Sequence, residues 1–212
     1  MQLYNYFRSS ASFRVRIALE LKGLGYEYVP VHLVKGEHKQ PGYAAVSPAL
    51  LVPTLQTDEG EHLGQSMAII EYLDETHPEP PLLPRDALGR AKVRALAQMI
   101  ACEIHPLNNL RVLKYLRGEL KLDDAAVNKW YAHWIAEAFG PFETLVARFS
   151  GGRYCFGDAV SLADVCLVPQ MFNSRRFNCD VTPYPTLVRI AAGLEAEPAF
   201  AAAAPHLQPD AA

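Results

Sequence analysis

Residues 6–19 read YFRSSASFRVRIAL and decide the fold of the first part of the chain. Just before them, residues 3–6 alternate apolar and polar side chains, as a short strand does. The serine-rich turn leads into an apolar helical face that ends at Lys22-Gly23, a basic residue followed by a C-cap glycine. Residues 26–33 are rich in Tyr and Val and predict a second strand. Together these segments predict a β-α-β unit with parallel strands, because such crossovers are right-handed.

The next segments complete a small α/β domain. Two short strands are predicted over residues 52–56 and 61–63, on either side of the turn at 58–60. Ser66 is a good N-cap for the helix that follows and continues to about residue 77. The proline-rich stretch 78–84 then predicts a linker, because proline continues neither a helix nor a central strand.

Beyond the linker only helical patterns occur, and no strand is predicted. They cover residues 90–120, 123–149, 162–173 and 185–196. The third helix follows Ser161-Leu162-Ala163-Asp164, which has the form of a capping box and is interpreted as structural. The fold class is therefore α/β plus all-α, with a βαβ-ββα domain over residues 1–80 and an all-helical domain over residues 86–212.

Composition excludes several classes of protein. The net charge of −3 and the pI near 6.2 give no reason to expect nucleic acid or an anionic membrane as a partner. No apolar run reaches the roughly 18 residues of a membrane span, and the N-terminus lacks the pattern of a secretory signal. The four cysteines form no CxxC pair and the seven histidines no HxxxH pattern, so reduced thiols are expected and a metal site is not.

The segment between the first strand and the first helix is the first candidate for chemistry. It lies at the carboxyl end of a strand, where open α/β layers bind ligands. A helix N-terminus there offers free N–H groups to an anion or thiolate, and the hydroxyls of Ser9, Ser10 and Ser12 can donate to the same group. An ordinary N-cap serine explains the same residues, so the segment alone leaves both interpretations open.

Two further motifs are equally ambiguous when taken singly. A proline directly before a strand, as in Val52-Pro53-Thr54, fits either an edge strand or a cis peptide that exposes the Val52 backbone to a peptide-like ligand. Gln65-Ser66 at the start of the next helix fits either a cap or a site for a carboxylate.

In combination these motifs resemble the zeta class of glutathione transferases, and the resemblance covers essentially the whole chain. The segments that carry it are residues 6–19, 52–55, 65–73 and 154–164, with 105–110 and 180–185 in addition. The class signature is S-S-C-S followed by an aromatic residue and R-V-R. Ala11 stands here in place of the cysteine, so whatever that thiol contributes in relatives is absent.

The resemblance implies a thioredoxin-like N-terminal domain that binds glutathione and a helical C-terminal domain that binds the substrate. Ser9 is expected to face the sulfur of glutathione, with Arg8 and Ser10 beside it as catalytic candidates. Tyr6 is the alternative, because other members of the superfamily use a tyrosine at the end of the first strand, but the Ser-Ser motif favours Ser9. The other residues expected to bind glutathione are His38, Gln40, Val52, Pro53 (expected to be cis), Gln65, Ser66, His105 and Asn109.

The implied reaction is glutathione-dependent cis–trans isomerisation of a maleyl keto-acid, either maleylpyruvate or maleylacetoacetate, in the breakdown of aromatic compounds. Thiolate addition, bond rotation and elimination would return glutathione unchanged. Because such substrates are dianions, Arg8, Arg111 and Arg176 are expected to bind their carboxylates. The sequence barely separates this activity from that of a transferase or dehalogenase acting on small α-halo acids.

Two other functions are disfavoured. A helical interaction module without activity would have no need to retain Ser9 and Gln65-Ser66, and a thiol-disulfide oxidoreductase would need a cysteine within residues 9–12. A cytoplasmic homodimer is expected from the family.

Overall fold

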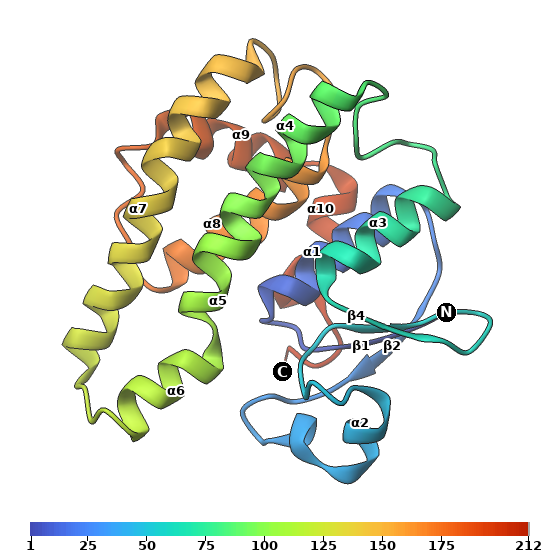
Figure 1. The fold of residues 1–212 in the computed structure, drawn as a ribbon, viewed down its shortest axis with the longest axis vertical. Coiled ribbons are helices and arrows are strands. Elements are labelled where there is room, and N and C mark those ends of the chain that lie inside the picture. Colours follow the sequence, from blue (N-terminus) through green and yellow to red (C-terminus); the bar gives the residue numbers. More distant parts are fainter. Residues whose placement is uncertain (212) are drawn as a thin grey trace. The chain divides into compact units, whose positions relative to one another are not determined.

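The computed structural model describes residues 1–211, and Figure 1 shows its fold. Contacts divide the chain into two units, Met1–Pro81 with Ala196–Ala212, and Leu82–Glu195. The sequence placed residues 196–212 in the helical domain, whereas their contacts are with the first unit. The reason is local packing: α10 (Pro198–Ala202) lies against α1 (Ser10–Leu21), and the buried guanidinium of Arg16 donates from Nε to the Ala203 carbonyl at 3.1 Å.

A mixed four-stranded sheet with the order β2-β1-β3-β4 forms the centre of the first unit. Its strands are β1 (Gln2–Asn5), β2 (Glu27–Pro30), β3 (Thr54–Gln56) and β4 (His62–Gly64). β1 and β2 are parallel, as the β-α-β pattern predicts, with Leu3 opposite Tyr28. β3 is antiparallel to both β1 and β4. The second strand ends at Pro30, earlier than predicted, and the chain there turns into an irregular loop.

Helices cover both faces of this sheet. α1 packs against α3 (Ser66–Thr76), and both lie on one side of the strands in Figure 1, with α2 (Pro41–Val46) on the other. A 3-10 turn, η1 (Glu37–Lys39), precedes α2, and a second, η3 (Pro205–Leu207), follows α10. α1 is buried all round from Ser10 to Leu19, whereas the sequence predicts one apolar face. The two arginines of α1 are therefore buried residues and not solvated ones.

The second unit consists of helices, and no strand occurs in the described chain between Leu82 and Glu195. Its elements are α4 (Ala87–Gln98), the π-helical segment η2 (Met99–Ile104), α5 (His105–Asn108), α6 (Leu110–Gly118), α7 (Asp124–Ser150), α8 (Leu162–Arg176) and α9 (Pro185–Glu195).

The long helix predicted over residues 90–120 is interrupted, which corrects the sequence interpretation. The backbone of Asn109 is extended, with ψ of 163°, and its side chain caps α6 by accepting a hydrogen bond from the Val112 N–H at 3.2 Å. His105 and Arg111 consequently belong to different helices, α5 and α6.

The predicted capping box at the start of α8 is confirmed. The fully buried carboxylate of Asp164 accepts hydrogen bonds from the Ser161 N–H at 2.9 Å, the Ser161 hydroxyl at 2.8 Å and the Cys155 N–H at 2.9 Å. These bonds connect the loop before α8 to a helix that is buried along most of its length. Within residues 1–211, no helix combines the length and apolar character that crossing a membrane requires.

Candidate functional site

Ser9 is the N-cap of α1. Its backbone is extended, with φ of −68° and ψ of 117°, and its Oγ accepts a hydrogen bond from the Ser12 N–H at 3.2 Å. A hydroxyl that accepts a bond still has its own hydrogen to donate. The capping and anion-binding interpretations, which compete in the sequence, are therefore compatible in one side chain.

The surroundings of this hydroxyl favour negative charge. The first turn of α1 contains no acidic residue of its own that would oppose the positive end of the helix dipole. Ser10, the first residue of the helix, is buried, and so is Ala11, at the position of the cysteine of the class signature. A thiolate placed at this helix start would gain the N–H groups and the Ser9 hydroxyl as donors.

A tight turn joins β1 to α1 and presents Arg8. The Ser9 N–H donates to the Tyr6 carbonyl at 2.9 Å, which closes the turn. The guanidinium of Arg8 donates to the Tyr6 hydroxyl at 2.8 Å from Nη2 and 3.3 Å from Nε, and it lies 5.0 Å from the centre of the Phe7 ring. Arg8 is thus exposed but held in one orientation.

Val52 has a buried side chain and an available backbone. The side chain belongs to a cluster with Tyr6, Val31 and Tyr43, which brings it close to the turn before Ser9. The Val52-Pro53 bond is cis, as predicted. Among residues 1–211, no hydrogen bond is made to the backbone N–H or C=O of Val52.

The start of α3 brings Gln65 and Ser66 next to a buried cation from α1. Gln65 has φ of 66° and ψ of 113°, a costly conformation for a residue with a side chain. Ser66 is buried, and its Oγ accepts a hydrogen bond from Nη1 of Arg14 at 3.4 Å, while Arg14 itself is 1% exposed. The first turn of α3 also lacks acidic residues.

The loop before α2 carries the two weaker candidates of the first unit. His38 lies in η1 and is half-buried, and Gln40 is the exposed N-cap of α2, whose side chain makes no capping bond. Both side chains remain candidates for contacts to glutathione.

Four of the predicted site residues belong to the second unit. His105 begins α5 and is half-buried, and Asn109 is the N-cap of α6 described above. Arg111 is exposed on α6, and Arg176 is exposed at the end of α8, where its guanidinium lies 4.7 Å from the centre of the Phe177 ring. Phe177 stacks on Tyr131 with 3.9 Å between ring centres, which gives Arg176 a rigid apolar support.

Sequence reasoning missed three residues around this site, namely Arg14, Arg16 and Asp210. Arg14 reaches Ser66, while Arg16 and Asp210 contact the peptide groups of Phe7. The continuous apolar pattern around the two arginines was a signal of their burial. No local signal marks Asp210, because its contact with Phe7 spans the length of the chain.

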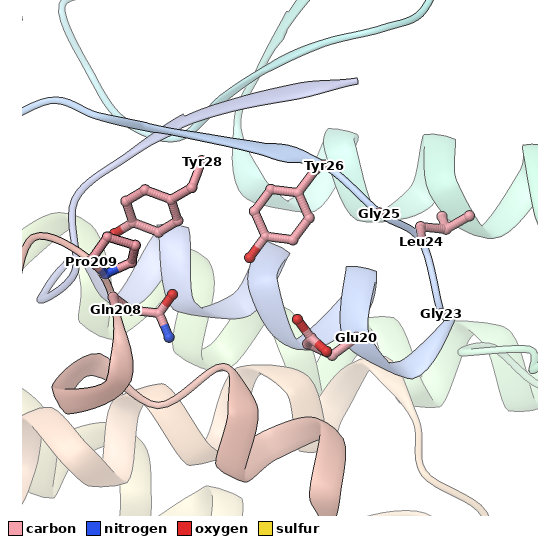
Figure 2. Close-up of a pocket in the computed structure, with 8 residues that line it drawn as sticks. All are labelled: Glu20, Gly23, Leu24, Gly25, Tyr26, Tyr28, Gln208 and Pro209. Carbon is pink, nitrogen blue, oxygen red and sulfur yellow. The ribbon is translucent and has the colours of Figure 1, made fainter.

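A depression on the surface of the first unit lies away from these residues. Its volume is about 510 Å³, and it is shown in Figure 2. Its lining comprises Glu20, Gly23, Leu24, Gly25, Tyr26, Tyr28, Gln208 and Pro209. None of the predicted site residues is among them, so this hollow is not the predicted site. Within residues 1–211, no group of three His, Cys, Asp or Glu side chains is arranged to hold a metal ion.

Comparison with known proteins is consistent with this geometry. Residues 8–76 match the family model of the glutathione S-transferase N-terminal domain, and residues 128–208 match that of the C-terminal domain. A maleylpyruvate isomerase from a Ralstonia species is 50% identical over the full length of both chains.

Two solved structures are also similar along the whole chain. The holo structure of a bacterial zeta-class maleylpyruvate isomerase has a TM-score of 0.97 at 50% identity, covering all of both chains. A maleylacetoacetate isomerase from Methylobacterium extorquens AM1, solved with malonate and glutathione, has a TM-score of 0.96 at 39% identity, again covering both completely. The chain therefore belongs to the glutathione S-transferase family, within the zeta class that contains the maleylpyruvate and maleylacetoacetate isomerases.

Proposed function

We propose that this protein catalyses the glutathione-dependent cis–trans isomerisation of a maleyl keto-acid, either maleylpyruvate or maleylacetoacetate. The observation that carries the proposal is the placement of Ser9, whose hydroxyl caps α1 and retains a hydrogen to donate to a thiolate at the helix start. The relatives named for these two isomerisations are similar along their entire length.

The residues of the first unit fit glutathione. A tripeptide needs a backbone partner for its central residue, and the unused N–H and C=O of Val52 provide one beside Pro53. Its γ-glutamyl end carries a carboxylate, which suits the start of α3, where Gln65, Ser66 and the buried cation of Arg14 lie together. His38, Gln40, His105 and Asn109 complete the proposed set of contacts.

When bound, glutathione supplies a thiolate that adds to the double bond beside a carbonyl, permits rotation about the resulting single bond, and leaves again. The protein's part is to keep the sulfur ionised and to hold the substrate. Ser9 donates to the sulfur, and the first turn of α1, with Ser10, adds the helix dipole, so the thiol pKa falls. Arg8 stabilises the oxygen that becomes negative during addition.

Arginine side chains are proposed to bind the two carboxylates of the substrate. Arg8 is held by the Tyr6 hydroxyl, and Arg176 is supported by the Phe177 ring, so each guanidinium is preorganised. Arg111 is exposed on α6 and completes the set. In this proposal the first unit supplies most of the contacts to glutathione, while Arg111 and Arg176 of the second unit bind the substrate together with Arg8 of the first.

A homodimer in the cytoplasm is proposed as the working state. The four cysteines are free, which suits a reducing compartment. Leu88 and Tyr115 of the second unit are 65% and 57% exposed, and apolar side chains of this size are commonly covered at subunit interfaces. Light scattering of the purified protein measures the mass, and a monomer at micromolar concentration contradicts the dimer.

The deciding experiment follows the ultraviolet absorbance of maleylpyruvate, and separately of maleylacetoacetate, with enzyme and substoichiometric glutathione. Many turnovers per glutathione molecule, and none without it, are expected for the isomerase, and the faster substrate identifies the physiological one. Absence of turnover with either substrate, together with conjugation or halide release from α-halo acids, contradicts the isomerase and establishes the transferase or dehalogenase.

A further inference from the structure

Phe7 lies in the turn that presents Arg8 and Ser9. Its backbone N–H and C=O are not used by the hydrogen bond that closes this turn. The closing bond runs from the Ser9 N–H to the Tyr6 carbonyl, so the N–H and C=O of Phe7 take no part in it. Buried backbone groups of this kind need partners, and those partners determine how the turn is oriented. Phe7 is half-buried, so its N–H and C=O need partners within the protein. The positions of those partners determine where Ser9 lies relative to β1.

Two side chains of opposite charge hold these groups. Oδ2 of Asp210 accepts the Phe7 N–H at 3.1 Å, and Nη2 of Arg16 donates to the Phe7 carbonyl at 3.0 Å. Arg16 is fully buried, and its Nη1 also donates to Oδ1 of Asn5 at 3.0 Å. The turn is therefore held from α1 on one side and from the C-terminal segment on the other.

Asp210 is itself fixed in place. Its Oδ1 accepts a hydrogen bond from the Tyr28 hydroxyl on β2, and Figure 2 shows this hydroxyl beside Pro209. Burial of Tyr28 raises its pKa well above the ordinary value, and the bond to Asp210 raises the pKa further. Tyr28 consequently remains a donor throughout the pH range of an assay, so Asp210 keeps one of its oxygens bonded.

The segment before Asp210 is anchored as well. Arg16 donates to the Ala203 carbonyl, and Nε2 of Gln208 donates to the carbonyls of Ala202 and Ala204 at 3.0 and 2.9 Å. The chain from α10 to Asp210 is thus held at both ends. Burial lowers the pKa of Arg16, and the nearby Tyr28, Tyr26 and Asp210 partly counteract that lowering.

From this geometry we propose that Asp210 is a positioning residue for Ser9. By holding the Phe7 N–H, it fixes the turn and so places the Ser9 hydroxyl where it donates to the glutathione sulfur. This role rests on the proposed function, because it requires Ser9 to stabilise a thiolate. Through Asp210, the segment of residues 203–210 thus contributes to the activity of the first unit.

The test measures the pKa of the thiol of bound glutathione in the full-length protein, from thiolate absorbance across pH and without maleyl substrate. Asp210→Ala is expected to raise this pKa by about one unit, which is about tenfold less thiolate at neutral pH. Tyr28→Phe should raise it less, because Asp210 keeps its bond to Phe7. Glu59→Gln removes an exposed carboxylate of the same unit and should leave the pKa unchanged.

The direction of the shift separates positioning from simple charge. Loss of a negative charge favours a nearby thiolate, so an electrostatic effect of Asp210→Ala alone would lower the thiol pKa. A rise in both variants supports positioning, and an unchanged or lowered pKa in both overturns it. If Asp210→Ala does not fold, Tyr28→Phe decides: a rise supports the role, and the wild-type value overturns it. Wild-type protein that fails to lower the thiol pKa would instead overturn the proposed function.

Discussion

The guanidinium of Arg8 donates two hydrogen bonds to the hydroxyl of Tyr6, two residues earlier in the chain. That hydroxyl oxygen therefore accepts from a cation that belongs to the same turn. Tyr6 is 3% exposed and packs in the cluster with Val52. Its place in the structure is that of a support for Arg8, and the assignment of Ser9 rather than Tyr6 as the donor to sulfur stays a prediction.

Tyr6→Phe tests this division of roles. Without the hydroxyl, Arg8 loses its fixed orientation, so KM for the maleyl substrate should rise about threefold to tenfold, the equivalent of one hydrogen bond. The thiol pKa of bound glutathione should stay at its wild-type value. A raised thiol pKa with unchanged KM would transfer the sulfur contact from Ser9 to Tyr6.

Ser9→Ala is expected to reduce kcat/KM at neutral pH about a hundredfold, because a donor to the developing charge is removed. Loss of the cap also lowers the free energy of unfolding by about 1 kcal/mol. Ser9→Asp provides the matched control, since aspartate caps α1 equally well but repels a thiolate. Low activity with wild-type stability is expected for Ser9→Asp. Full turnover in Ser9→Ala would remove Ser9 from the mechanism.

Arg176→Ala should raise KM for the dicarboxylate more than KM for glutathione, because one charge-assisted carboxylate contact is lost. Arg175→Ala is the neighbouring control, since the Arg175 guanidinium pairs with Glu195 at 2.6 Å. Steady-state kinetics with each substrate varied in turn measures both constants. Equal effects on the two KM values in Arg176→Ala would exclude Arg176 from the substrate site.

Asp164→Ala should lower the free energy of unfolding by about 3 kcal/mol or more, because it leaves three donors, two of them backbone N–H groups, without their acceptor in a buried place. Asp123→Ala is the comparison, because Asp123 caps α7 at an exposed position by accepting the Ala126 N–H at 2.8 Å. Its loss should cost about 1 kcal/mol. Urea unfolding followed by circular dichroism measures the free energy of unfolding of both variants. Equal losses of stability in the two variants would contradict the importance of burial at Asp164.

The order in which the cysteines are alkylated should follow the exposure and the pKa of each thiol. Burial raises the pKa of Cys179 to about 11, so about one thiol in a thousand is ionised at pH 8 and the fraction rises tenfold per pH unit. Cys102 is exposed and should react first with iodoacetamide. Burial raises the pKa of Cys155 well above its ordinary value, so that thiol should react only after unfolding. Peptide mass mapping gives the order, and early labelling of Cys155 would contradict its burial.

Features defined by neighbouring residues were predictable from the sequence. The cap at Ser9 and the capping box of Ser161 and Asp164 depend on residues within a few positions of each other, and the β-α-β start follows from the patterns of three consecutive segments. The cis bond before Pro53 followed from the family resemblance, because a local pattern alone left the edge-strand alternative open.

Features defined by tertiary packing were not predictable in the same way. The break at Asn109 was missed because the helical pattern runs through it, although the Asn109 side chain caps α6 locally. The apolar pattern around Arg16 is a signal of its burial, but it does not reveal the partners of its guanidinium, which are Asn5, Phe7 and Ala203. Most of these partners come from other elements of the chain, so spacing within the helix could not reveal them.

The return of residues 196–212 to the first unit has a consequence for biosynthesis. The helical unit is in effect inserted between two parts of the first, so the ribosome must complete the helices before it makes Ala203 and Asp210. Until then Arg16 lacks one of its acceptors, and the Phe7 N–H lacks its carboxylate. The unit whose translation begins first therefore cannot form all its native contacts until the helical unit has been synthesised, although domains of a nascent polypeptide usually fold in the order of their synthesis.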